Sequence, residues 1–95
     1  MIQAASVARR LLITGRVQGV GFRFAFADEA RERGLRGWVR NRRDGRVEAI
    51  IAGTPEDVEA MVAWARHGPP AARVTAIDVE PAAGEFDRFD VAPTL

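Results

Sequence analysis

The sequence predicts an α+β protein in which two helices cover one face of an antiparallel sheet. Short segments alternate apolar and polar residues with period two, and two longer segments repeat apolar residues three or four positions apart. Turn signals rich in glycine, proline and aspartate separate these segments. The expected order is β-α-β-β-α-β, followed by a short fifth strand near the end.

The first strand is expected over residues 7–15 and the first helix over residues 22–33. Val7, Leu11 and Ile13 share one face of the strand. In the helix, apolar side chains fall four positions apart and a glycine stands just beyond the last residue, as is common at helix ends. These residues are Phe22, Phe26, Ala30 and Gly34.

A β-hairpin is expected in the middle of the chain, with strands over residues 35–41 and 46–53. The Asp44-Gly45 pair between them is typical of a tight hairpin turn. By period two, Asn41 shares a face with Leu35, Gly37 and Val39. An otherwise apolar or small face therefore ends in a carboxamide.

The second helix has a clear start, because Thr54 is a capping residue and Pro55 suits the first helical position. Gly68-Pro69-Pro70 ends this helix. The strand over residues 73–80 follows, and residues 86–91 can form a short edge strand. The inward side chains of the 73–80 strand are expected to be Thr75, Ile77 and Val79.

Two crossover helices on one face of such a sheet make the ferredoxin-like sandwich the expected fold. A chain of 95 residues suffices for one hydrophobic core, so residues 1–95 are expected to form a single domain. Because this fold carries many unrelated functions, the function must be argued from the site.

Composition excludes several kinds of function. The 14 basic and 13 acidic residues nearly balance, so the pI of about 9.0 does not indicate nucleic-acid binding. The chain has no cysteine and no lysine, which excludes disulfides, thiolate zinc sites and Schiff-base chemistry. It also has no secretory signal pattern and no apolar run of roughly 20 residues. A cytoplasmic protein that binds no membrane is expected.

Residues 15–24, GRVQGVGFRF, place three glycines and two arginines where the first helix begins. No Ser, Thr, Asp or Asn is present to cap that helix. Arg23 adds a positive charge at the positive end of the helix dipole, which is unfavourable by roughly 0.3–1 kcal/mol. A phosphate-sized anion would satisfy both the free amides and the guanidinium. The alternative is a plain glycine turn beside a solvated arginine.

Three longer segments carry a family resemblance. GRVQGVGFR (residues 15–23), GWVRNRRDGRVE (residues 37–48) and MVAWARHGPPAARV (residues 61–74) resemble the acylphosphatase family over nearly the whole chain. The resemblance implies a ferredoxin-like fold and hydrolysis of acyl phosphates, the mixed anhydrides of a carboxylic acid with phosphate. It also implies that water is the nucleophile and that no metal ion or cofactor takes part.

The same resemblance implies two catalytic residues, Arg23 and Asn41. Arg23 would neutralise and orient the phosphoryl oxygens, and Asn41 would position the attacking water. Backbone amides of the loop would bind the phosphoryl group, and inorganic phosphate or sulfate would occupy the same place. The amides belong to Val17, Gln18, Gly19, Val20, Gly21 and Phe22. A monomer is expected.

Other interpretations stay open. Asn41 can instead open the hairpin turn, a common position for asparagine. His67 is expected to be exposed at a helix end, and no carboxylate cluster indicates a metal site. The arginines around the hairpin are either a solvated surface or a cluster that steers anions. They are Arg40, Arg42, Arg43 and Arg46.

Two other functions compete with acyl phosphate hydrolysis. One is a catalytically weak module that binds phosphate or carbamoyl phosphate, like the acylphosphatase-like domain of certain hydrogenase maturation proteins. The other is an RNA-recognition module, which needs aromatic residues on the first and third strands that this chain lacks. The chain also departs from the family, which commonly has a threonine where Phe26 stands and a basic, aromatic ending in place of FDVAPTL.

Overall fold

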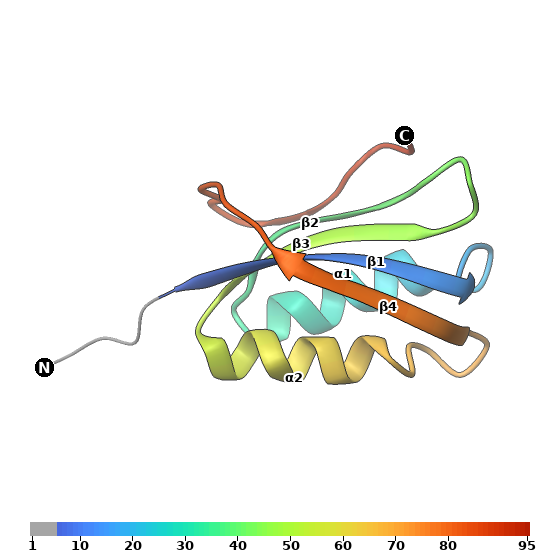
Figure 1. Cartoon of the computed structure of the whole chain (residues 1–95), viewed down its shortest axis with the longest axis horizontal. Coiled ribbons are helices and arrows are strands. Elements are labelled where there is room, and N and C mark those ends of the chain that lie inside the picture. The colour runs from blue at the N-terminus through green and yellow to red at the C-terminus, as the bar shows by residue number, and fades with distance from the viewer. Residues whose placement is uncertain (1–5) are drawn as a thin grey trace, which may run out of the picture.

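The computed structural model describes residues 6–95, which form a five-stranded sheet with both helices on one face (Figure 1). The predicted order of strands and helices is confirmed, and the boundaries shift by a few residues. The elements are β1 (Val7–Arg16), α1 (Phe22–Glu32), β2 (Arg36–Asn41), β3 (Val47–Gly53), α2 (Pro55–Ala65), β4 (Arg73–Pro81) and β5 (Phe89–Val91).

The strands lie in the order β4-β1-β3-β2-β5. The pairs formed by β1 to β4 are all antiparallel, as predicted. The short fifth strand is also confirmed at an edge, but it runs parallel to β2, with Phe89 beside Gly37. No sequence signal had indicated the direction of this strand. The chain leaves β4 at one edge and returns along the opposite edge in the direction of β2 (Figure 1).

The hydrophobic core lies between the sheet and the two helices. Side chains from β1, β2 and β3 alternate into it as the period-two pattern predicts, and apolar side chains of α1 and α2 meet them. Its largest fully buried side chains are Phe22, Phe26, Leu11, Ile13, Ile51, Met61, Val17, Val39 and Val47.

The prediction for β4 is only partly correct. Ile77 is half-buried, but Thr75 is exposed and 41% of the surface of Val79 is accessible. Thr75 lies at a shift in register between β1 and β4, and Val74 packs against the core in its place. Val79 is exposed because β4 is an edge strand, while α2 packs against β1 and β3. Periodicity indicates which side chains share a face, but not whether a helix covers that face.

Four aromatic rings fix α1 in place. The Phe26 ring lies 6.1 Å from Phe22, 6.0 Å from Trp64 on α2 and 5.8 Å from Phe89 on β5, measured between ring centroids. Phe26 is therefore a core residue at the position where the family commonly has a threonine. This packing sets where the N-terminus of α1 lies relative to the sheet.

The helix ends agree with the sequence signals. The Thr54 hydroxyl accepts a hydrogen bond from the Asp57 amide at 3.2 Å, so the predicted cap of α2 is confirmed. At the end of α1, the Gly34 amide donates to the Arg31 carbonyl and the Leu35 amide to the Ala30 carbonyl. Each of the two helices has eleven residues. Within residues 6–95, no helix is long and apolar enough to cross a bilayer.

Candidate active site

The N-terminus of α1 has no side-chain cap, as the sequence predicts. Gly21 occupies the N-cap position with φ of 79°, and the first turn carries no acidic residue. Within residues 6–95, the backbone N–H groups from Gln18 to Phe24 donate to no protein acceptor. A helix start normally finds partners for these groups. This one leaves a row of donors that can bind an anion.

The loop before α1 alternates in backbone handedness. Gly19 and Gly21 have φ values of 72° and 79°, whereas the non-glycine residues between and beside them have negative φ. An added Cβ would meet no atom within 4 Å at either glycine, so the conformation, and not a lack of space, requires glycine here. Alternating handedness turns successive N–H groups toward one concave side.

Arg23 and Asn41, which are distant in sequence, line the same hollow at this loop. Its volume is about 200 Å³, and it is lined by Val17, Gln18, Gly19, Gly21, Phe22, Arg23, Phe24 and Asn41. Of the residues predicted to bind phosphate, Val20 alone does not line it, because its partly buried side chain packs against the core. The β1–α1 loop and the β2–β3 hairpin lie at the same end of the sheet (Figure 1).

Two larger hollows lie away from this end. One, of about 400 Å³, lies between α2 and the Val7 and Val79 region of the sheet. The other, of about 470 Å³, lies beneath the segment that joins β4 to β5. Neither contains an uncapped helix start of the kind that Gly21 begins, so the smaller hollow is the candidate active site.

Asn41 ends the core face of β2, directly beyond the fully buried Val39. Its backbone carbonyl accepts a hydrogen bond from the Leu95 amide at 3.1 Å. Its side-chain Oδ1 is buried, and no donor among residues 6–95 reaches it. A buried acceptor without a protein partner is unusual and calls for an explanation. The unpartnered acceptor therefore makes Asn41 a candidate for contact with a ligand of the hollow.

Arg23 lies in the first turn of α1 and makes no ion pair with any carboxylate of residues 6–95. Its guanidinium carbon lies 5.5 Å from the centroid of the Phe24 ring. The guanidinium is therefore available to an anion at the helix start, where the free amides also lie.

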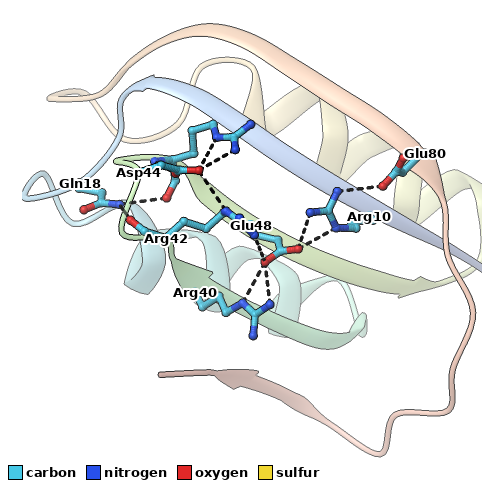
Figure 2. Close-up of polar contacts among 8 residues, drawn as sticks. Arg10, Gln18, Arg40, Arg42, Asp44, Glu48 and Glu80 are labelled. Atoms are coloured by element: carbon cyan, nitrogen blue, oxygen red, sulfur yellow. Dashed lines mark hydrogen bonds and ion pairs between the residues drawn. The ribbon is translucent and has the colours of Figure 1, made fainter. Parts of the chain in front are cut away.

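The side chain of Gln18 has a role that the sequence did not indicate. Its Nε2 donates to the carbonyl of Arg42 at 2.7 Å and to that of Arg46 at 2.9 Å (Figure 2). These bonds connect the β1–α1 loop to the hairpin that follows Asn41. The sequence indicated only the backbone amide of Gln18 as part of the site, because no local motif signals a contact between its side chain and the hairpin.

A buried carboxylate lies on the sheet face opposite the helices. Glu48 has a side chain that is only 5% exposed, and it pairs with Arg10 at 2.6 Å, Arg40 at 2.8 Å and Arg42 at 3.3 Å (Figure 2). Burial by itself would raise the pKa of the Glu48 carboxyl, but hydrogen bonds from Arg40 and Arg10 outweigh it and hold that pKa below its usual range. Arg40 and Arg42, the neighbours of Asn41, are thereby held in place.

The arginines around the hairpin are thus mostly paired. Besides the bonds to Glu48, the Arg46 side chain and amide bind Asp44 and hold the pKa of its carboxyl well below the usual range. Paired arginines attract distant anions less than isolated ones would. This arrangement weakens the interpretation of the hairpin as a cluster that steers anions.

Other sequence candidates lie outside the hollow. His67 is exposed beyond the end of α2. Across residues 6–95, no three His, Asp or Glu side chains are grouped in a way that could hold a metal ion.

Comparisons with known proteins agree with one another. The sequence profile of the acylphosphatase family matches residues 9–91. An acylphosphatase from Cupriavidus pinatubonensis is 54% identical over 81 residues, which cover 85% of this chain and 90% of the relative.

Solved structures show the same fold. An acylphosphatase from Coxiella burnetii superimposes with a TM-score of 0.89 at 31% identity, covering 92% of this chain and 93% of that one. Full-length HypF, in its phosphate- and nucleotide-bound form, matches with a TM-score of 0.89 at 28% identity. That match covers 98% of this chain but only 13% of HypF.

Proposed function

The chain belongs to the acylphosphatase family, and we propose that it hydrolyses acyl phosphates in the hollow at the start of α1. Water attacks phosphorus, a new P–O bond forms, and the bond from phosphorus to the acyl oxygen breaks. The products are a carboxylate and inorganic phosphate. The observation that carries this placement is the uncapped start of α1, whose free amides share one hollow with Arg23 and Asn41.

The loop amides and Arg23 bind the phosphoryl group in this proposal. The amides of Val17 to Phe22 donate to the phosphoryl oxygens at the positive end of the α1 dipole. The Arg23 guanidinium adds a second charge-assisted contact and orients the group. Phosphoryl transfer depends mainly on the position of the reacting groups and on stabilisation of charge on the equatorial oxygens. The loop amides and Arg23 would supply both.

Asn41 holds the attacking water. Its Oδ1 can accept a hydrogen bond from that water, while its amide group can donate to a phosphoryl oxygen. A carboxamide does not titrate, so it positions water over a wide pH range. The water loses one proton as the bond forms, and this proton leaves with the phosphate or passes to solvent.

The leaving group needs little help, because a carboxylate is the conjugate base of a fairly strong acid. An alkoxide leaving group would need a proton donor, and the lining of the hollow contains no acidic side chain. We therefore expect poor hydrolysis of phosphate monoesters.

A test is the release of phosphate from benzoyl phosphate by the wild type, Arg23→Ala and Asn41→Ala, each with and without a chelator. Each substitution should lower kcat/KM by about a hundredfold, as for loss of a transition-state donor. The chelator should have no effect. Full activity in both variants would contradict the proposed site.

The alternative is a module that binds phosphate or carbamoyl phosphate with little turnover. The structural similarity of this chain to one part of HypF, whose solved structure is phosphate- and nucleotide-bound, supports this alternative. Tight binding of carbamoyl phosphate without release of phosphate would support the module and contradict the enzyme.

Three further expectations remain proposals. We expect the protein to be a monomer in the cytoplasm, to bind no nucleic acid and to bind inorganic phosphate or sulfate at the loop. Size-exclusion chromatography with light scattering tests the monomer, and competitive inhibition by phosphate and sulfate tests the loop.

A further inference from the structure

We propose that the exposed ring of Phe24 binds the acyl group of the substrate, so that the enzyme prefers acyl phosphates with apolar and especially aromatic acyl groups. This inference rests on the proposed function and extends it from the phosphoryl group to the rest of the substrate.

The first observation is the exposure of Phe24. Its surface is 63% accessible, although phenylalanine is usually buried. Within residues 6–95, the other exposed large hydrophobic side chains are Val79 and Leu95, and neither lines the candidate site. Among the residues that line the hollow, Phe24 is therefore the one with a large apolar side chain exposed to solvent. A substrate that covers this ring removes apolar surface from water.

The second observation is the distance between Phe24 and the phosphoryl site. The ring centroid lies 5.5 Å from the guanidinium carbon of Arg23. A guanidinium binds phosphate oxygens at about 2.7–2.9 Å, and in an acyl phosphate one bridging oxygen joins phosphorus to the carbonyl carbon. The substituent on that carbon is therefore within reach of the ring while Arg23 holds the phosphoryl group.

The third observation concerns the rest of the hollow. Gly19 and Gly21 carry no side chain, and Val17 and Phe22 are almost fully buried. The remaining side chains of the lining, those of Gln18, Arg23 and Asn41, are polar. An apolar acyl group that extends out of the hollow therefore finds its apolar contact on Phe24.

The size of the acyl group determines how much it gains. A phenyl group can stack on the ring face that Arg23 does not cover or meet the ring edge to face, and such aromatic pairs are favourable beyond the area that they bury. The methyl group of acetyl phosphate covers only a small part of the ring. The ratio of kcat/KM for benzoyl phosphate to kcat/KM for acetyl phosphate isolates this contact, because the phosphoryl group is the same in both.

The experiment measures this ratio for the wild type, Phe24→Ala, Phe24→Leu and the control Val79→Ala, which removes an exposed apolar side chain far from the hollow. We expect Phe24→Ala to lower the ratio by about three- to tenfold, mainly through KM for benzoyl phosphate. Phe24→Leu should lower it less, and Val79→Ala should leave it unchanged. The inhibition constant of inorganic phosphate, which has no acyl group, should change less than KM for benzoyl phosphate.

The outcomes separate this inference from the proposed function. A wild type that hydrolyses both substrates, with the same ratio in Phe24→Ala, would overturn the role of Phe24 and leave the proposed function standing. If the wild type bound the two compounds without cleaving them, the proposed function would fail. The ratio of their dissociation constants would then test Phe24 in the same way. If Phe24→Ala lowered kcat/KM for both substrates and the affinity for phosphate by the same factor, the substitution would act generally through Arg23. That result would also overturn the inference.

Discussion

The side-chain nitrogen of Gln18 lies 2.7 Å from the carbonyl oxygen of Arg42, the residue that follows Asn41. The loop that holds free amides is thereby bonded to the strand end that holds the carboxamide. The same nitrogen also donates to Arg46 across the hairpin, at 2.9 Å. Neither the loop nor the hairpin tip belongs to a helix or strand, so in the proposed mechanism this link sets the separation between the phosphoryl group and the attacking water.

Gln18→Glu should lower kcat by about ten- to a hundredfold, since small misplacements of catalytic groups have effects of that order. A carboxylate has nearly the same shape as the amide but cannot donate, and it would repel both carbonyls. Steady-state kinetics with benzoyl phosphate provide the measurement. Gln18→Ala, which removes the bonds without adding a charge, should have a smaller effect. Wild-type kcat in Gln18→Glu would show that the link does not position the site.

Arg23→Ala should separate activity from stability. Activity should fall by about a hundredfold, because the guanidinium is proposed to stabilise charge on the phosphoryl group. The free energy of unfolding should change by less than about 1 kcal/mol, because the removal of a cation from the positive end of the α1 dipole offsets the loss of its contact with the Phe24 ring. Urea unfolding beside kinetic assays checks both. Arg23→Lys is the control that keeps the charge but loses the two-pronged contact with the phosphoryl group, so its activity should also fall. A large loss of stability in Arg23→Ala would indicate a structural role for Arg23 instead.

Asn41→Ala should reduce kcat by about a hundredfold while the inhibition constant of phosphate changes little. The reason is that Asn41 is proposed to hold the water, whereas the loop amides and Arg23 hold the phosphoryl group. The inhibition constant of phosphate, measured together with single-turnover rates, distinguishes holding the water from binding the phosphoryl group. A weakened affinity for phosphate equal to the loss in rate would mean that Asn41 mainly binds the phosphoryl group.

Glu48→Gln should lower the free energy of unfolding by about 1–3 kcal/mol at pH 7. This is less than for a fully buried pair, because the partner arginines Arg10, Arg40 and Arg42 are 24–31% exposed. Asp90→Asn is a matched control, since the ion pair of Asp90 with Arg88 is well exposed. It should change stability by no more than about 0.5 kcal/mol.

The effect of Glu48 should also depend on pH. Its pKa is lowered in the folded protein, so its stabilising contribution is complete above the unfolded value of about 4.3. The contribution is lost as the pH falls through the lower, folded-state pKa. The difference in stability between the wild type and Glu48→Gln should therefore shrink between pH 5 and about pH 3. A difference that stays constant down to that pH would contradict the ionised, paired state of Glu48.

Local sequence signals predicted much of the molecule. The boundaries of several elements were indicated by Thr54, Asp44-Gly45 and Gly34. The predicted lack of a capping side chain before Phe22 is confirmed. Arg23 and Asn41 were selected by their resemblance to a family motif. They line one hollow, while their chemical roles stay predictions that the variants above can test.

Other features had no local signal. The parallel direction of β5 follows from the route of the chain across the sheet, and the exposure of Val79 follows from where α2 packs. The contact of Gln18 with Arg42 joins two loops, so neither segment reports it alone. The period of the first helix placed Phe26 on its apolar face, but the contacts of its ring with Trp64 and Phe89 had no local signal.

By itself, the sequence determined the type and order of the elements and left the start of α1 without a cap, because periodicity and capping depend on residues close in the chain. Only the tertiary structure decided that Glu48 is buried among arginines and that Gln18 reaches the hairpin. Those contacts depend on strand order and register, which bring together residues far apart in sequence.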